Sequence, residues 1–181
     1  GMMPLVRKYD ADMIGLLWGP EGMPRDEHER GMLTAEILAK AAEYKIMVNA
    51  HEAVRPTGLC RTYPNLINYE AVLGNEYNKF SPGTPPNHNV DIAYTRMLAG
   101  PLDFHQGSFR TVSVADFKPR NEAPLIMGTP CRTLASYVVF QNHLPMVADY
   151  PSAYRGHPAL PVLAAIPATW DDTKAIAGAV A

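Results

Sequence analysis

The sequence predicts an α/β fold in which parallel strands alternate with helices. Residues 12–18 form a short, continuous apolar run, which is typical of a strand buried on both faces, as in parallel sheets. Residues 45–49 are predicted to be a second buried strand. Between them, residues 27–44 carry a helical pattern of apolar positions. This order of strand, loop, helix and strand indicates a βαβ unit, for which a right-handed crossover is expected.

The boundaries of these first elements follow from local signals. The first strand stops at Gly19-Pro20. Asp26, with Glu29 three residues later, is a candidate capping box that opens the helix. The apolar positions that recur through this helix are Leu33, Ile37, Ala41 and Tyr44.

The middle of the chain is predicted to contain one more strand and much loop. Residues 66–69 form the third predicted strand, and residues 80–89 are predicted to be an irregular loop, too rich in proline for any helix. Residues 90–98 fit either a strand or a short helix. Residues 104–129 are expected to be a long loop with short pieces of structure.

The last third is predicted to be helical, followed by the approach to a strand. Thr129 is a candidate N-cap with Pro130 at the first helical position, opening a helix over residues 131–143. A second helical stretch over about 145–165 is expected to be broken by Pro151 and Pro158. Residues 170–176 are interpreted as the approach to a final strand.

This alternation suggests a (β/α) barrel, but the length leaves two interpretations open. Barrels of this kind usually need about 250 residues, whereas this chain has 181 and offers only four or five candidate strands. The chain is therefore either a complete smaller α/β domain or part of a barrel.

Composition excludes some functions. The formal net charge is -2, so there is no basic footprint for nucleic acid. No apolar run approaches the ~18 residues of a membrane-spanning helix, and residues 1–4 lack signal-peptide architecture, so we expect neither a nucleic-acid nor a membrane partner. Cys60 and Cys131 lack metal-ligand spacing; a disulfide framework is not expected, although one bridge stays open.

Carboxylates at the ends of apolar runs are the strongest functional signal. Glu52, Glu70 and Glu76 lie within 25 residues of one another. Burying an unpaired charge costs free energy, so a purely structural core is a poor reason for three of them. Acid–base catalysis and binding of hard metal ions both use such groups.

The motifs around these carboxylates resemble glycoside hydrolase family 97, a family of α-glucosidases and α-galactosidases. The likeness begins at His51-Glu52 and continues through Pro56-Thr57-Gly58 and Arg61-Thr62-Tyr63-Pro64-Asn65 to Glu70 and Glu76. It extends to residues 95–104, 148–151 and 167–174, and so covers nearly the whole chain.

The resemblance implies a partial (β/α)8 barrel of TIM type. Family members are several times longer, with an N-terminal β-sandwich, a central barrel and a C-terminal β domain. Residues 1–181 would form a single domain, the C-terminal half of the catalytic barrel from roughly strand 4 to strand 8. Both flanking domains would be absent.

The resemblance also implies a branch and a set of roles. Inverting members have glutamate after the histidine, whereas retaining members have glycine there and an aspartate nucleophile ending the preceding strand. Glu52 follows His51, and Leu17-Trp18-Gly19 offers no aspartate, so the inverting α-glucosidase type is expected. Glu76 would be the general acid, with Glu52 and Glu21 on the base side.

The remaining implied roles concern ligands. His51 and Arg61 would contact the oligosaccharide substrate, although Arg61 and Tyr63 also fit a role in holding the loop. Glu52, Glu70 and Glu76 would bind calcium, which suits carboxylate clusters. Exposed barrel edges would favour a homo-oligomer. Family members are typically periplasmic or exported, and this chain leaves localisation unknown.

Three alternatives accompany this hypothesis: a catalytically inactive fragment that keeps a partial carbohydrate or calcium site, an α-galactosidase-type member, and an unrelated small α/β domain. Several residues are interpreted as structural rather than catalytic. We expect turn or capping roles for Asp103 and Asp172, and core packing for Trp18 and Trp170. Four histidines outside the motif are also interpreted as structural, because they lack metal-ligand spacing with one another: His88, His105, His143 and His157.

Overall fold

The computed structural model describes residues 13–16, 27–51 and 55–179. The chain divides into two compact units, residues 1–71 and residues 72–181, each of which is described by itself. The prediction that the whole chain forms one domain stays a prediction.

The first unit contains a three-stranded parallel sheet in the order β1-β2-β3. Its elements are β1 (Met13–Leu16), α2 (Glu27–Glu43), β2 (Met47–Ala50), α3 (Leu59–Thr62) and β3 (Leu66–Tyr69). The predicted βαβ unit is confirmed, and the third strand has the bounds that its apolar run indicates. Strand neighbours that follow chain order are typical of β/α barrels, but the partial barrel itself stays a prediction.

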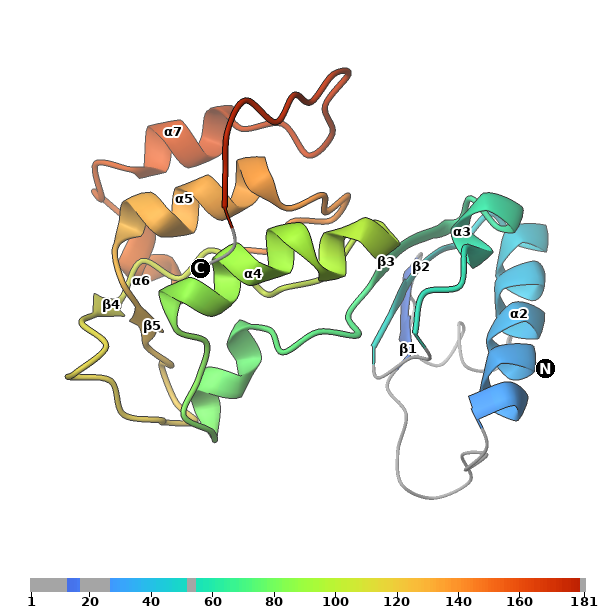
Figure 1. Cartoon of the computed structure of the whole chain (residues 1–181), viewed down its shortest axis with the longest axis horizontal. Helices are drawn as coiled ribbons and strands as arrows, with labels where there is room; N and C mark the ends of the chain where they lie inside the picture. The colour runs from blue at the N-terminus through green and yellow to red at the C-terminus, as the bar shows by residue number, and fades with distance from the viewer. Residues whose placement is uncertain (1–12, 17–26, 52–54, 180–181) are drawn as a thin grey trace. The chain divides into compact units, whose positions relative to one another are not determined.

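Helix α2 lies beside this sheet (Figure 1) and buries a different stripe from the one expected. Thr34, Leu38 and Ala41 are fully buried, whereas Leu33 and Ile37 are only half-buried and Tyr44 is exposed. The predicted helix is confirmed, and so is the burial of Ala41. Nearer the helix start, Thr34 and Leu38 are buried in place of the expected Leu33 and Ile37, one position later in each case. Leu38 and Ala41 form one apolar cluster with residues of β2 and β3, so the sheet selects the stripe.

The end of α2 is a Schellman motif built without glycine. The backbone N–H of Ile46 donates to the Ala41 carbonyl oxygen at 3.0 Å, and that of Lys45 donates to Ala42 at 3.0 Å. Lys45 takes the left-handed conformation with φ of 56°. The side-chain amide of Asn65 then donates to the carbonyls of Leu38 and Ile46 at 3.1 and 3.2 Å, which ties the helix end to the sheet.

The second unit is mostly helix and irregular backbone. It contains η1 (Asn75–Lys79), α4 (Pro86–Tyr94), η2 (Arg96–Ala99), β4 (Thr111–Val112), β5 (Ile126–Met127), α5 (Pro130–Val139), α6 (Pro151–Tyr154) and α7 (Leu160–Ala165). Strands β4 and β5 pair in parallel. Helices α4 and α5 lie side by side (Figure 1), and both line one apolar hollow.

Two predictions about proline were wrong for the same reason. Helix α4 begins at Pro86, inside a stretch that was expected to exclude any helix, and α6 begins at Pro151, which was expected to break one. Proline is well suited to the first helical position, because its missing N–H has no partner there in any helix. Proline near a helix start therefore marks a beginning rather than an end.

Helix α5 begins as predicted but ends four residues early. The Thr129 hydroxyl accepts a hydrogen bond from the Arg132 N–H, with Pro130 at the first position. The chain becomes extended at Phe140, whose ring packs edge-on against Phe104, with 4.9 Å between centroids. The next carbonyl, of Gln141, accepts a hydrogen bond from Leu102 N–H at 2.9 Å, so tertiary contacts end the helix.

The C-terminal residues differ from expectation. Residues 170–176 contain no strand, and Trp170 is 45% exposed rather than part of the core. Trp18 lies outside the described residues. Cys60 and Cys131 are free thiols.

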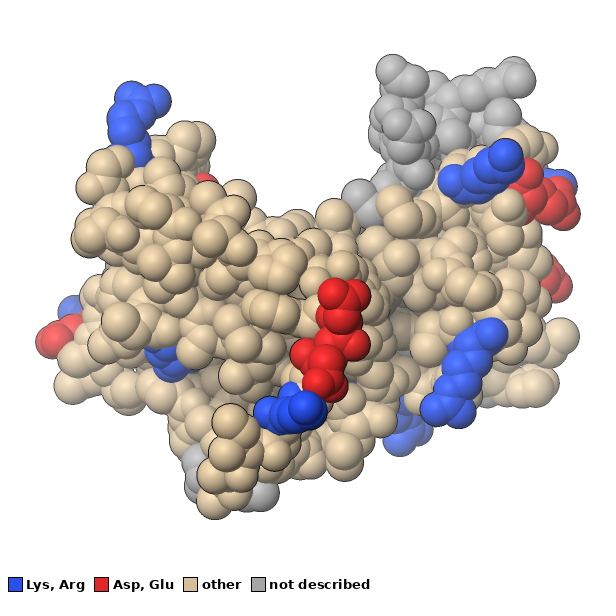
Figure 2. All heavy atoms as spheres, turned by 90° about the horizontal axis from the view of Figure 1, so that it is seen from above, with Lys and Arg blue, Asp and Glu red and all other residues tan. Residues whose placement is uncertain are grey.

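Within the described ranges, no helix is long and apolar enough to cross a membrane. On the face shown in Figure 2, Lys and Arg are scattered, some of them beside Asp or Glu, and form no continuous basic patch.

Candidate active site

The predicted site residues fall into three groups in the structure. Glu21 and Glu52 lie outside the described residues. His51, Arg61 and Glu70 belong to the first unit, and Glu76 belongs to the second. The geometry of the site is therefore described within each unit separately.

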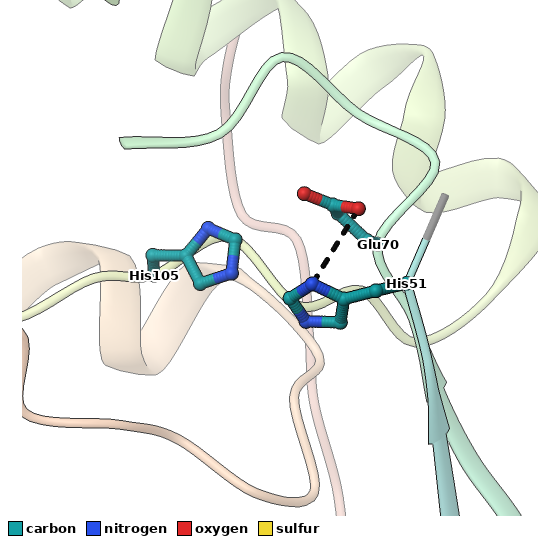
Figure 3. Close-up of side chains that lie close together, drawn as sticks. All are labelled: His51, Glu70 and His105. Carbon is teal, nitrogen blue, oxygen red and sulfur yellow. Dashed lines mark ion pairs between the residues drawn. The ribbon is translucent and has the colours of Figure 1, made fainter. Parts of the chain in front are cut away.

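His51 and Glu70 meet at the carboxyl ends of adjacent strands. His51 follows β2, Glu70 follows β3, and the Glu70 N–H donates to the Ala50 carbonyl at 2.8 Å, continuing the parallel pairing. The His51 Nδ1 lies 3.6 Å from a Glu70 carboxylate oxygen (Figure 3), and the Glu70 side chain is only 6% exposed. The imidazole thus gives a buried carboxylate a nearby polar partner, which lowers the cost of its burial.

Arg61 is exposed in the last turn of α3. That position leaves its guanidinium accessible to a ligand, and its predicted contact with substrate stays a prediction.

Glu76 stands in η1, and a set of hydrogen bonds from its neighbour Asn75 holds that element in place. The Asn75 N–H donates to the Phe104 carbonyl at 2.9 Å, and its side-chain amide donates to the His105 carbonyl at 3.2 Å. The Asn75 side-chain oxygen accepts a hydrogen bond from the Thr84 hydroxyl at 2.7 Å. These bonds position the start of η1, and therefore Glu76, against residues 104–105.

Glu76 opens onto a cavity of about 220 Å³. Three of its lining side chains carry or can carry charge: Glu76, Lys79 and His105. The remainder is Asn75 and an apolar wall of Pro124, Ile126, Met146, Val147 and Ala148. A concave, mainly apolar wall with a few convergent polar groups is the usual composition of a small-molecule site.

His105 lines this cavity and lies beside Asp103, an arrangement that the sequence interpretation missed. Asp103 is fully buried and accepts the His105 backbone N–H at 3.4 Å, which agrees with its predicted turn role. Its carboxylate also lies 3.7 Å from the His105 Nε2. His105 was interpreted as structural, but its ring lines the Glu76 cavity. In the sequence, an aspartate two residues before a histidine was the one signal that could have indicated this contact.

Asp149 is a second buried carboxylate that received no role from the sequence. Its side chain is 1% exposed and accepts hydrogen bonds from the Ser108 hydroxyl and from the backbone of Phe109, Arg110 and Tyr150. The Arg110 guanidinium also binds it and lies over the Tyr150 ring, 4.9 Å from the centroid.

This network holds the buried segment 102–109 against the residues that precede α6. Burial alone would raise the pKa of the Asp149 carboxyl, but the hydrogen bonds from Arg110, Ser108 and the backbone outweigh it and lower that pKa. Asp149 is therefore a stabilising anchor beside the cavity wall at Ala148.

The donor set for calcium is only partly described. Ca²⁺ takes six to eight oxygen ligands. Glu70 and Glu76 supply carboxylates of the right chemistry, each within its own unit, and Glu52 lies outside the described residues. The residues present suit a hard cation in kind, and the calcium site stays a prediction.

Comparison with known families gives one match to a family model. The model described as Glycoside hydrolase 97 matches residues 22–72, which include β2, β3, His51 and Glu70. The matched segment therefore carries two of the three strands of the parallel sheet, β2 and β3, with their strand-end side chains.

Two curated relatives match most of the chain. The retaining alpha-galactosidase of Bacteroides thetaiotaomicron is 36% identical over 159 residues, which are 86% of this chain and 24% of the relative. The probable retaining alpha-galactosidase of Streptomyces bingchenggensis is 27% identical over 167 residues, 89% of this chain and 24% of the relative. The chain thus spans about a quarter of the length of these relatives. Both names are of the retaining type, so the predicted inverting type is not confirmed.

Solved structures of an enzyme from Pseudoalteromonas sp. strain K8 also resemble this chain. A Glycoside Hydrolase Family 97 enzyme in complex with acarbose superposes with a TM-score of 0.79 at 31% identity, covering 98% of this chain and 29% of that one. One in complex with panose gives a TM-score of 0.70 at 37% identity, covering 81% and 22%. Both are complexes with oligosaccharides.

Proposed function

We propose that this chain, whose family-model and structural matches support membership of glycoside hydrolase family 97, belongs to an enzyme that hydrolyses terminal α-glucosidic bonds in oligosaccharides. The single observation that carries the proposal is Glu76. Its motif predicts a general acid, and its side chain lines a concave cavity of the composition that small ligands require.

The chemistry assigns a role to each carboxylate. Glu76 protonates the glycosidic oxygen as the bond breaks, and a base-side carboxylate, Glu52 with Glu21, takes a proton from the attacking water. His51, oriented beside Glu70, contacts a sugar hydroxyl, and Arg61 makes an outer contact. Inversion requires about 6.5–9.5 Å between acid and base, enough for a water molecule.

Calcium is the proposed cofactor. Glu52, Glu70 and Glu76 would hold the ion, which would polarise the site and offset repulsion between the carboxylates.

An α-galactosidase of the same family is the second candidate function. The observation in its favour is that both curated relatives carry the name retaining alpha-galactosidase. Glu52 argues against the retaining mechanism, because the resemblance implies glycine at this position in retaining members.

One experiment separates these functions. The chain is assayed with p-nitrophenyl α-glucoside and p-nitrophenyl α-galactoside, with calcium and with chelator, alongside Glu76→Gln. Calcium-dependent release of nitrophenol is expected. Glu76→Gln should lower it, by less than the roughly 10²–10⁴-fold of a full general-acid step, because nitrophenolate leaves with little protonation. Proton NMR of the first sugar formed reports inversion or retention of the anomer. No turnover of either glycoside would identify a catalytically inactive fragment.

A further inference from the structure

The geometry points to His105 as a specificity-determining residue that contacts a sugar hydroxyl in the Glu76 cavity, with Asp103 as its positioning residue. This inference deepens the proposed function and rests on it. The ligand class is a hydroxyl-rich ring of monosaccharide size. A cavity of about 220 Å³ lies below the roughly 300 Å³ at which sites for drug-sized molecules begin, so one ring suits it better than several.

The first support is that the His105 ring is held in one place. His105 is 9% exposed, and its backbone has φ of 58°, a left-handed conformation that is uncommon for residues other than glycine, though less so for histidine than for most. The His105 carbonyl accepts a hydrogen bond from the Asn75 side chain at 3.2 Å. The same asparagine precedes Glu76, so His105 and Glu76 are fixed to one support.

The second support is the buried acid behind the imidazole. The Asp103 side chain is fully buried, and its carboxylate lies 3.7 Å from His105 Nε2, while the other oxygen accepts the His105 backbone N–H at 3.4 Å. At 3.7 Å the contact with the ring is electrostatic rather than a hydrogen bond. The carboxylate, held by the turn, therefore favours a ring orientation that keeps Nε2 beside it.

The third support is the glycine that faces the ring. A Cβ at Gly74 would lie 3.1 Å from His105 Nδ1 and 3.1 Å from the Phe104 carbonyl oxygen. Gly74 has φ of -87°, which any residue adopts, so backbone conformation does not demand glycine there. The lack of a side chain instead lets Gly74 lie close against the buried Nδ1 of the imidazole, so that the start of η1 and the ring pack together.

The test is binding of methyl α-glucoside and methyl α-galactoside to the ¹⁵N-labelled chain, followed by NMR of the histidine side chains. Saturable shifts are expected for the His105 imidazole and not for His143, which lies outside this cavity. His105→Gly removes the ring without straining the left-handed backbone and should weaken the affinity for the preferred sugar at least tenfold. Gly74→Ala should weaken it similarly by crowding the ring.

Asp103→Asn tests the positioning role. Its readout is the ¹⁵N shifts of the His105 ring, which a purely packing role of Asp103 would leave unchanged. Affinity should fall, and the ¹⁵N shifts of the His105 ring should change even without sugar, because the neighbouring charge is gone. Gly31→Ala is the matched control, since nothing lies within 4 Å of a Cβ placed there; it should bind as the unmodified chain does.

The outcomes separate the two proposals. If the unmodified chain binds neither sugar, the proposed function fails at this cavity and the role of His105 fails with it. If the unmodified chain binds, while His105→Gly and Gly74→Ala retain full affinity, only the role of His105 is overturned. Unchanged His105 ring shifts in Asp103→Asn would remove the positioning role of Asp103.

Discussion

At the scale of single residues, this protein buries carboxylates and gives each a specific partner. Glu70 lies against His51, Asp103 against His105, and Asp149 against Arg110. A buried acid is tolerated only with such compensation, because desolvation otherwise disfavours its charged form. The partners of the three acids differ. Asp149 accepts hydrogen bonds from several donors and suits an anchor, whereas Glu70 and Asp103 each lie beside a histidine.

Asp149 should make stability depend on acid pH. Its folded-state pKa is lowered, so its contribution to the free energy of unfolding is fully present above the unfolded pKa of about 4 and is lost as pH falls through the folded value. Urea unfolding followed by circular dichroism from pH 7 to pH 3 should show this loss. Asp149→Asn should be destabilised by about 3 kcal/mol at pH 7, since it leaves the Arg110 charge partly buried without its partner.

The same substitution at an exposed acid is the control. Asp172 pairs with Lys174 at the surface, with 69% of its side chain exposed, and Asp172→Asn should change the free energy of unfolding by less than about 0.5 kcal/mol. An Asp149→Asn variant as stable as the unmodified chain at pH 7 would contradict the anchoring role.

At the scale of elements, tertiary contacts decide where helices begin and end. The apolar spacing of α2 was predicted, yet the sheet selects the stripe through Thr34, Leu38 and Ala41. Helix α5 stops where Phe140 enters the cluster of Phe104. Proline at 86 and 151 begins helices because neither position needs an N–H.

The end of α2 offers a sharp prediction at this scale. Lys45 occupies the left-handed position of the Schellman motif, where glycine carries no steric cost. Lys45→Gly should therefore raise the free energy of unfolding by about 1 kcal/mol, measured by urea titration. Lys40→Gly, the same change inside the helix, should lower it by about 1 kcal/mol. Equal effects of the two substitutions would mean that the left-handed geometry is not populated.

At the scale of the whole molecule, the chain presents two compact units and spans about a quarter of its curated relatives. The parallel sheet with strand-end side chains lies in the first, and the Glu76 cavity lies in the second. Self-association through exposed edges stays a prediction, which sedimentation velocity over a range of concentrations tests directly.

Calcium binding is a prediction about the whole molecule, because its proposed ligands come from both units. Calcium at 100 times its Kd should stabilise the folded state by about 2.7 kcal/mol, seen as a rise in Tm that chelator reverses. Glu70→Gln and Glu76→Gln should each reduce that rise, whereas Glu36→Gln, on the exposed side of α2, should leave it intact. A Tm that calcium leaves unchanged would contradict the metal site.

The sequence by itself determined the α/β class, the first three strands, helix α2, the start of α5 and the motif residues around Glu70 and Glu76. These depend on local signals: uninterrupted apolar runs, helical periodicity, an N-cap followed by proline, and a long ordered motif. The start of α4 at Pro86 also follows a local signal, proline at the first helical position, which the sequence interpretation took for a loop. Only the tertiary structure decided which face of α2 is buried, where α5 ends, and which partners Asp103, His105 and Asp149 contact. Those outcomes depend on contacts between segments that lie far apart in the sequence. Residues 102–109 are buried without the apolar periodicity of a helix or strand, so no local pattern predicts which residues they contact.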